Sequence, residues 1–246
     1  ERLKGLFGDR LYIELQRHGT LPERQTEQGL VDLAYRLGVP LVATNEPYFA
    51  KVDDYAAHDA LICIAEGEVL QLSVSQDTST TEDAYMQVIV AKTAALFSAA
   101  AEVGAVVAKR PPSEQAALES YGRNLGIAFQ LIDDVLDYSG STEKLGKGVG
   151  DDFRERKITL PVVLSYRRGT TEERNFWKRT LEDGDQTPDD FTYAKKLMER
   201  HGALKDTIDR ANHYGDIARD ALAIFPGSDL KDALLEAVEF CVARAY

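Results

Sequence analysis

The sequence predicts a mostly all-α protein preceded by a short α/β segment. From about residue 67 onward, apolar residues recur at helical spacing in one segment after another. No run in that part alternates apolar and polar residues as a half-buried strand does. Before that point, two short β-rich runs flank a single helical run. We therefore divide the chain into an α/β fragment, residues 1–66, and an all-α part, residues 67–246.

Composition excludes several classes of protein. The chain has 246 residues, is 44% hydrophobic and carries a formal net charge of −12, so we expect a globular core and no affinity for nucleic acid. Its two cysteines, Cys63 and Cys241, lack metal-site spacing and are typical of reduced thiols in a cytoplasmic protein. No apolar run approaches the ~20 residues of a membrane helix, and no signal peptide is visible.

The first part of the chain has a strand–helix–strand pattern. Residues 10–16 alternate apolar and polar residues and predict a strand. Residues 22–38 place leucines at helical spacing and end at Gly38, a typical helix C-cap. Residues 39–49 predict a buried strand that runs into a loop at Pro47.

Two long helices open the second part. Residues 79–108 begin with a capping-box pattern, in which Ser79 or Thr80 precedes Glu82 or Asp83 by three positions. The many alanines of this stretch suit close packing against another helix, which we place at residues 113–140. Shorter helices, separated by glycine or proline, are predicted at about 158–168, 171–182, 189–201, 203–225 and 228–246.

Three aspartates interrupt the second long helix, in "AFQLIDDVLDYSG", residues 128–140. Asp133 and Asp137 are four apart and share a helix face with Gln130, while Asp134 lies beside them. Carboxylates this close repel one another, and burying them is costly. Mg²⁺ removes that cost, because it prefers oxygen ligands and bridges carboxylates to phosphates. The alternative is a solvated acidic face, which is common on helices.

Basic residues flank this acidic motif in the sequence. Lys92 and Thr93 interrupt an apolar, alanine-rich helix, where the lysine either extends to solvent or reaches a polar cavity. A glycine-broken loop after the aspartate helix carries more charged residues, namely Lys144, Lys147, Asp151, Asp152 and Lys157.

Four segments carry a family resemblance in this order and spacing: "GEVLQL" (67–72), "KTAALFSAA" (92–100), "YGRNLGIAFQLIDDVLDYSG" (121–140) and "GKGVGDDFRERKITLPVV" (146–163). From about Glu66 to Tyr246 the chain resembles the trans-polyprenyl diphosphate synthases, most closely the bacterial type that makes quinone side chains. The resemblance implies part of the all-α isoprenoid synthase bundle and a homodimer. It also implies Mg²⁺-dependent transfer of an allylic prenyl diphosphate to isopentenyl diphosphate.

The resemblance also implies a role for each residue of the motifs. Asp133, Asp134 and Asp137 correspond to the family's second aspartate-rich motif, which binds Mg²⁺ on the allylic diphosphate, and Asp151 supports the metal shell. The implied diphosphate contacts are Lys92, Lys147 and Lys157, and the implied neighbours of the reacting carbons are Thr93 and Gln130.

The family's first aspartate-rich motif and its isopentenyl diphosphate site do not occur upstream of "GEVLQL". The acidic cluster at residues 52–59 lacks the arginine pair of that motif and follows a strand–loop pattern. We therefore predict that this chain is inactive alone, and that helices 79–108 and 113–140 leave apolar faces uncovered. Product chain length stays open.

Residues 6–19 and 30–67 resemble another family, the polymerase-and-histidinol-phosphatase (PHP) domain of the DNA polymerase III α subunit of bacteria. Glu46 and Tyr48 replace that domain's metal-binding aspartate and histidine, so His58 is interpreted as structural. The two resemblances meet at residues 64–69, inside both domains, and we infer a truncated or mis-joined chimera. The alternative function is therefore a non-catalytic fragment of a replication protein.

Overall fold

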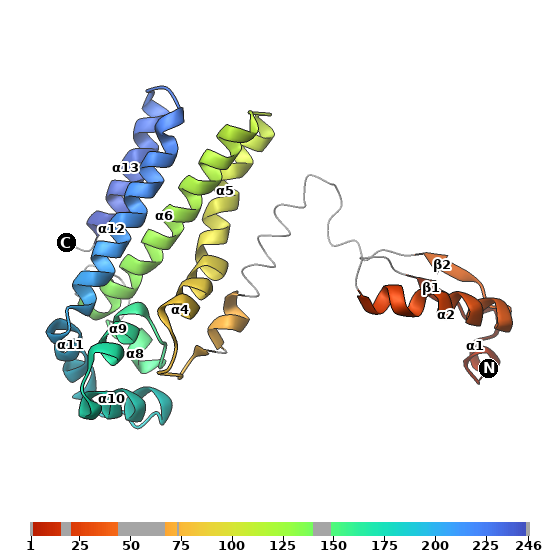
Figure 1. Ribbon diagram of the computed structural model, residues 1–246, viewed down its shortest axis with the longest axis horizontal. Coiled ribbons are helices and arrows are strands. Elements are labelled where there is room, and N and C mark those ends of the chain that lie inside the picture. The colour runs from red at the N-terminus through yellow and green to blue at the C-terminus, as the bar shows by residue number, and fades with distance from the viewer. Residues whose placement is uncertain (1, 16–20, 44–66, 73, 140–148, 245–246) are drawn as a thin grey trace. The chain divides into compact units, whose positions relative to one another are not determined.

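The computed structural model divides the chain into two compact units, Glu1–Asp54 and Tyr55–Tyr246 (Figure 1). The predicted boundary between residues 66 and 67 adjoins a stretch outside the described residues, so its position stays a prediction. The structure describes residues 2–15, 21–43, 67–72, 74–139 and 149–244.

The first unit contains the predicted strand–helix–strand motif. Strands β1 (Ile13–Leu15) and β2 (Leu41–Ala43) pair in parallel, with Ile13 opposite Leu41. Helix α2 (Leu21–Leu37) connects them, as a parallel pair requires. Gly38 follows α2 at φ +57°, a left-handed conformation that confirms the predicted glycine C-cap. The short α1 (Arg2–Phe7) and the 3₁₀ turn η1 (Gly8–Arg10) were not predicted.

Two long, adjacent helical stretches dominate the second unit (Figure 1). The first consists of α4 (Glu82–Ile89), the π-helical segment η3 (Val90–Ala94) and α5 (Ala95–Val107). The second is α6 (Pro112–Ser139). A Cβ atom at Gly122 would lie 2.2 Å from the Phe97 carbonyl oxygen. Glycine therefore permits the two backbones to approach this closely, as the alanine-rich sequence predicts.

The five predicted shorter helices are confirmed, with ends that differ by at most three residues. The segment α8 (Asp151–Arg154) is an addition, because it lies in a stretch that the sequence predicts as loop. The other elements are α9 (Leu160–Arg168), α10 (Thr171–Trp177), the π-helical η4 (Lys178–Glu182), α11 (Asp190–Arg200), α12 (Ala203–Ala221), the 3₁₀ turn η5 (Leu222–Ile224) and α13 (Asp229–Ala243).

The predicted capping box at the start of α4 is wrong. The N-cap is Thr81, whose side chain accepts a hydrogen bond from the Ala84 N–H at 3.1 Å. The hydroxyl of Thr80 instead donates to the Asp77 carbonyl oxygen at 2.7 Å and closes the preceding turn.

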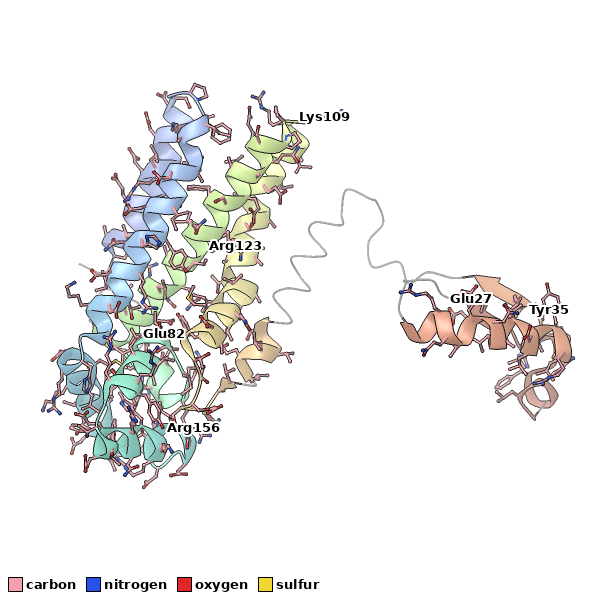
Figure 2. All side chains as sticks on the ribbon, viewed as in Figure 1. Glu27, Tyr35, Glu82, Lys109, Arg123 and Arg156 are labelled. Atoms are coloured by element: carbon pink, nitrogen blue, oxygen red, sulfur yellow. The ribbon has the colours of Figure 1, made fainter. Side chains whose placement is uncertain are left out.

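Ion pairs and a large core fix the lower part of the helical unit. Glu82, labelled in Figure 2, lies at the start of α4 and accepts from Arg210 of α12 at 2.6 Å and from Arg167 of α9. The main hydrophobic core of this unit includes Trp177, Phe153 and Tyr138, each with at most 1% of its surface exposed. These contacts hold α4, α6 and α9 at fixed positions around the site described below.

Helix α5 presents an uncovered apolar side, as the sequence predicts. Its exposed residues are Leu96, Val103, Val106 and Val107, between 48% and 76% exposed within this chain. By length and composition alone, Glu82–Val107 also qualifies as a membrane-spanning helix, although the sequence analysis expects none. That finding is weak evidence, because the same stretch carries Lys92 and packs against α6.

Candidate functional site

A cavity of about 400 Å³ lies among α4, η3, α6, α8 and the residues that precede α9. This volume is within the range of small-molecule sites. Among the described residues, Lys92 and Lys157 line the cavity, and carboxyl groups outnumber these two lysines. The carboxyl groups belong to Asp133, Asp134, Asp137, Asp151, Asp152 and Glu155.

Lys92 reaches the cavity from the π-helical segment η3. Its ammonium lies 2.9 Å from a carboxylate oxygen of Glu68 and donates to the Gln71 side chain at 2.7 Å. Gly67 makes this packing possible, because a Cβ atom there would lie 2.4 Å from the Lys92 backbone nitrogen. The helical residues 67–72 therefore pack closely against η3 and fix the position of the lysine.

Asp134 is the most buried carboxyl group of the site, with 3% of its surface exposed. The hydroxyl of Tyr85 donates to its Oδ2 at 2.5 Å, and the amide of Gln130 donates to its Oδ1 at 2.9 Å. Thr93 extends this chain of bonds, because its hydroxyl donates to the Gln130 Oε1 at 3.0 Å. Burial raises the pKa of Asp134 to about 7, although the hydrogen bond from Tyr85 favours the ionised form.

Asp137 connects α6 to the N-terminus of α8. Its two carboxylate oxygens accept the backbone N–H groups of Asp151 at 3.2 Å and Asp152 at 3.0 Å. The backbone enters α8 through Gly150, whose φ of +87° is a left-handed conformation that favours glycine. Burial raises the pKa of Asp137, and the nearby charge of Asp152 adds to that effect. This contact holds the N-terminus of α8 next to α6 at the edge of the cavity.

The remaining charged residues form short ion pairs at the rim. Lys157 binds Asp152 at 3.0 Å and Glu155 at 2.8 Å. Burial disfavours the charged form of Lys157 and by itself lowers its pKa. The hydrogen bonds to these two carboxylates outweigh the effect of burial and raise the pKa of the lysine. Asp151, which is more exposed, pairs with Arg154 at 2.5 Å.

The structure brings most of the predicted site residues together. Of those in the described part of the chain, Thr93 alone is not a lining residue, and it contacts the cavity through Gln130. Lys147 lies outside the described residues. Asp133 is partly exposed to the cavity, and no hydrogen bond or ion pair joins its carboxylate to another described residue.

Several residues of the site have no role that the sequence predicts. Tyr85 lies seven positions before Lys92, and only the tertiary structure brings it to Asp134. Glu68 and Gln71 belong to the "GEVLQL" segment, and their spacing of three residues on a helix was the available signal. Glu155 lies between the predicted Asp151 and Lys157 in the sequence, and Asp152 was named there as a charged residue without a role, so proximity in the chain was a second signal.

The fold and the site define a class of protein. It is a helical bundle with a cavity that combines an excess of carboxyl groups with two lysines. A polyanion alone would be repelled by the carboxylates, whereas a cation that the carboxylates bind would, together with the lysines, attract a polyanion. The arrangement therefore suits a cation and a phosphate-bearing compound bound together.

Comparisons with known proteins agree with this class. Residues 46–198 match the family model described as polyprenyl synthetase. The octaprenyl diphosphate synthase of Haemophilus influenzae is 41% identical over 188 residues, which are 76% of this chain and 57% of that enzyme. A polyprenyl synthase from Caulobacter crescentus, solved with calcium and isoprenyl diphosphate, is 43% identical, with a TM-score of 0.77 over 92% of this chain and 66% of that one. A decaprenyl diphosphate synthase structure from Rhodobacter capsulatus has 41% identity and a TM-score of 0.75, with the same coverage of both chains.

The chain belongs to the polyprenyl synthetase family. It spans 57% of the length of the Haemophilus enzyme. The family match begins at residue 46 and therefore includes residues 46–66, which the sequence analysis assigns to the PHP-like fragment. The PHP resemblance itself stays a prediction.

Proposed function

We propose that this chain carries the allylic-diphosphate half of a polyprenyl diphosphate synthase active site. The observation that supports the proposal is that Asp133, Asp134 and Asp137 line one cavity together with Lys92 and Lys157. The related Caulobacter synthase was solved with calcium and isoprenyl diphosphate. A cavity lined by carboxylates and lysines favours such a pair, a divalent cation and a diphosphate.

The donor set of the cavity fits Mg²⁺ that is shared with a phosphate ligand. Among the described residues, no three acidic, histidine or cysteine side chains are arranged to hold a metal by themselves. Mg²⁺ commonly keeps several waters and uses only one or two carboxylates together with substrate phosphates. Asp133 and Asp137 would be those carboxylates, and Asp134 and Asp151 would support them. Bound there, Mg²⁺ would act as a Lewis acid that stabilises negative charge on the departing diphosphate.

The residues of this chain have separate roles in the proposed reaction. Lys92 and Lys157, together with Lys147, would bind the diphosphate and stabilise its charge as the allylic C–O bond breaks. Thr93 and Gln130 would lie beside the carbons between which the new bond forms. Isopentenyl diphosphate would then attack that cation through its double bond and lose a proton, which leaves a product one isoprene unit longer.

We further propose that the chain does not elongate prenyl chains by itself. No segment upstream of "GEVLQL" supplies the first aspartate-rich motif or the isopentenyl diphosphate site. Elongation of an allylic diphosphate by the purified chain with isopentenyl diphosphate and Mg²⁺ would show this to be wrong. Pairing into a homodimer and a cytoplasmic location remain predictions.

The first unit has a separate proposed origin. Residues 6–19 and 30–67 resemble the PHP region in sequence, although the polyprenyl synthetase model also covers residues 46–66, and the strand–helix–strand motif of the first unit differs from the helical unit that follows. We propose that the two parts were joined within a chimera. Long sequencing reads across the codons of residues 64–69 test this, because a continuous gene in an intact genome would refute the mis-joining.

Calorimetry tests the proposed ligand. The wild-type chain should bind inorganic pyrophosphate in the presence of Mg²⁺ and not in the presence of EDTA. Asp133→Asn should weaken that binding by about tenfold or more, because a ligand to the cation is lost. The matched control is Asp183→Asn, an equal charge change at an exposed residue of the turn after η4, which should bind like the wild type. Equal heats for wild type and Asp133→Asn would refute the assignment.

A further inference from the structure

A chain of buried hydrogen bonds leads from α4 into the site and includes one residue to which no role has been assigned above. Tyr85 is 4% exposed, and its ring belongs to the main core. Its hydroxyl donates to Asp134 Oδ2 at 2.5 Å, while Asp134 Oδ1 accepts from Gln130. The other end of the Gln130 amide accepts from Thr93 at 3.0 Å.

These bonds determine which way the Gln130 amide faces. When Asp134 is ionised it only accepts hydrogen bonds, so it receives the NH₂ group of Gln130, and the amide oxygen is thereby turned toward Thr93. The Tyr85 hydroxyl restrains Asp134 from the opposite side. Without it, Asp134 would keep one of its two side-chain partners and gain freedom to rotate.

Asp134 also differs from Asp133 in the number of carboxylate oxygens that are free to bind a ligand. Both of its oxygens already accept bonds from protein side chains, and 3% of its surface is exposed. Asp133, one position earlier, is partly exposed to the same cavity. Consecutive residues on a helix point about 100° apart, so the same backbone that buries Asp134 presents Asp133.

We propose that Tyr85 is a positioning residue of the diphosphate site: its hydroxyl holds Asp134, and Asp134 in turn orients Gln130 and keeps Asp133 directed into the cavity. This inference rests on the proposed function, because it assumes that the cavity binds a cation and a diphosphate. Tyr85 lines the cavity, but its hydroxyl is already donated to Asp134.

Tyr85→Phe tests the proposal, because it removes the hydroxyl and leaves the buried ring. The matched control is Tyr121→Phe. Tyr121 is equally buried, and its hydroxyl donates to the Leu234 carbonyl oxygen at 3.0 Å, in a cluster that does not contact the cavity. Both variants lose one hydrogen bond of a buried tyrosine, so a merely structural role predicts similar effects for the two.

The probe is inorganic pyrophosphate with Mg²⁺, titrated into each full-length chain by calorimetry. Tyr85→Phe should bind about tenfold more weakly, the value of one hydrogen bond to a charged group, and Tyr121→Phe should bind like the wild type. The side-chain NH₂ signals of Gln130 in a ¹H–¹⁵N spectrum should shift or broaden in Tyr85→Phe alone, in the absence of ligand. Fluorescence of the buried Trp177 checks that each variant is folded.

The outcomes distinguish a failure of the positioning role of Tyr85 from a failure of the proposed function. If the wild type binds and Tyr85→Phe binds equally well, the positioning role is wrong and the proposed function stands. If both tyrosine variants weaken binding equally, Tyr85 contributes only to general stability and the proposal is refuted. If the wild type does not bind, the proposed function fails and this inference fails with it.

Discussion

The buried Asp134 predicts a specific dependence of stability on pH in the metal-free chain. Its folded pKa of about 7 lies above the ordinary value of 3.8 because the group is buried. The folded chain therefore holds a proton that the unfolded chain releases above about pH 4. The free energy of unfolding should fall as the pH rises from about 4 to about 7, by up to about 1.4 kcal/mol per pH unit from this group alone.

Asp134→Asn removes this titration and nearly preserves the shape of the side chain. We expect the variant and the wild type to have similar stability near pH 4. Above pH 7 the variant should be more stable by at most about 4 kcal/mol, which is the free energy that corresponds to a shift of about three pKa units. Asparagine can still accept from Tyr85, and Gln130 can turn its amide over to match the new NH₂ group.

Urea unfolding in EDTA, followed by Trp177 fluorescence, measures this difference. Trp177 is the one tryptophan of the sequence, is fully buried and lies in the helical unit, so it reports on the unfolding of that unit. Asp183→Asn is the control, because Asp183 is exposed. A difference between Asp134→Asn and wild type that stays constant from pH 4 to pH 8 would refute the assignment of the raised pKa to Asp134.

Three other predictions concern the lysine, the helix contact and a structural ion pair. Lys92→Gln should weaken Mg²⁺–pyrophosphate binding by about tenfold in calorimetry, since one charge-assisted contact is lost, whereas Lys178→Gln at an exposed position should have no effect. Gly126→Ala should lower the free energy of unfolding by about 1–3 kcal/mol, because its Cβ would lie 2.7 Å from the Ala94 Cα, and unchanged urea curves would contradict that close approach. Asp190→Asn should cost about 1–3 kcal/mol at pH 7, because hydrogen bonds from Arg179 lower the pKa of Asp190. That pair stabilises the fold above about pH 4 and is lost as the pH falls through the lowered pKa, so the thermal midpoints of Asp190→Asn and wild type should converge in acid.

The sequence predicts the helical elements well where glycine or proline separates amphipathic segments. Helices α9, α10, α11 and α12 begin within two residues of the predicted positions. The start of α4 was misplaced because several hydroxyl residues stand in a row, and only the structure shows which of them is the N-cap. Helix α8 was missed because four residues give no periodicity, and it depends on Asp137 to accept its first N–H groups.

The candidate site was predictable as a set of residues, but not as an arrangement. Local spacing places Asp133, Asp134 and Asp137 on one helix, but it does not show that Asp134 is buried and bonded while Asp133 is open to the cavity. That distinction depends on Tyr85, which is 49 positions from Asp134 in the sequence. The position of Lys92 likewise depends on a π-helical segment and on Gly67, neither of which periodicity indicates.

The central claim is that the aspartates of α6 and the lysines opposite them hold a cation together with a diphosphate. A crystal structure of the chain with Mn²⁺ and pyrophosphate, using the anomalous signal of manganese, tests this most directly. We expect an anomalous peak within coordination distance of Asp133 or Asp137, and pyrophosphate oxygens in contact with Lys92 or Lys157. Manganese bound elsewhere, or pyrophosphate bound outside this cavity, would contradict the claim.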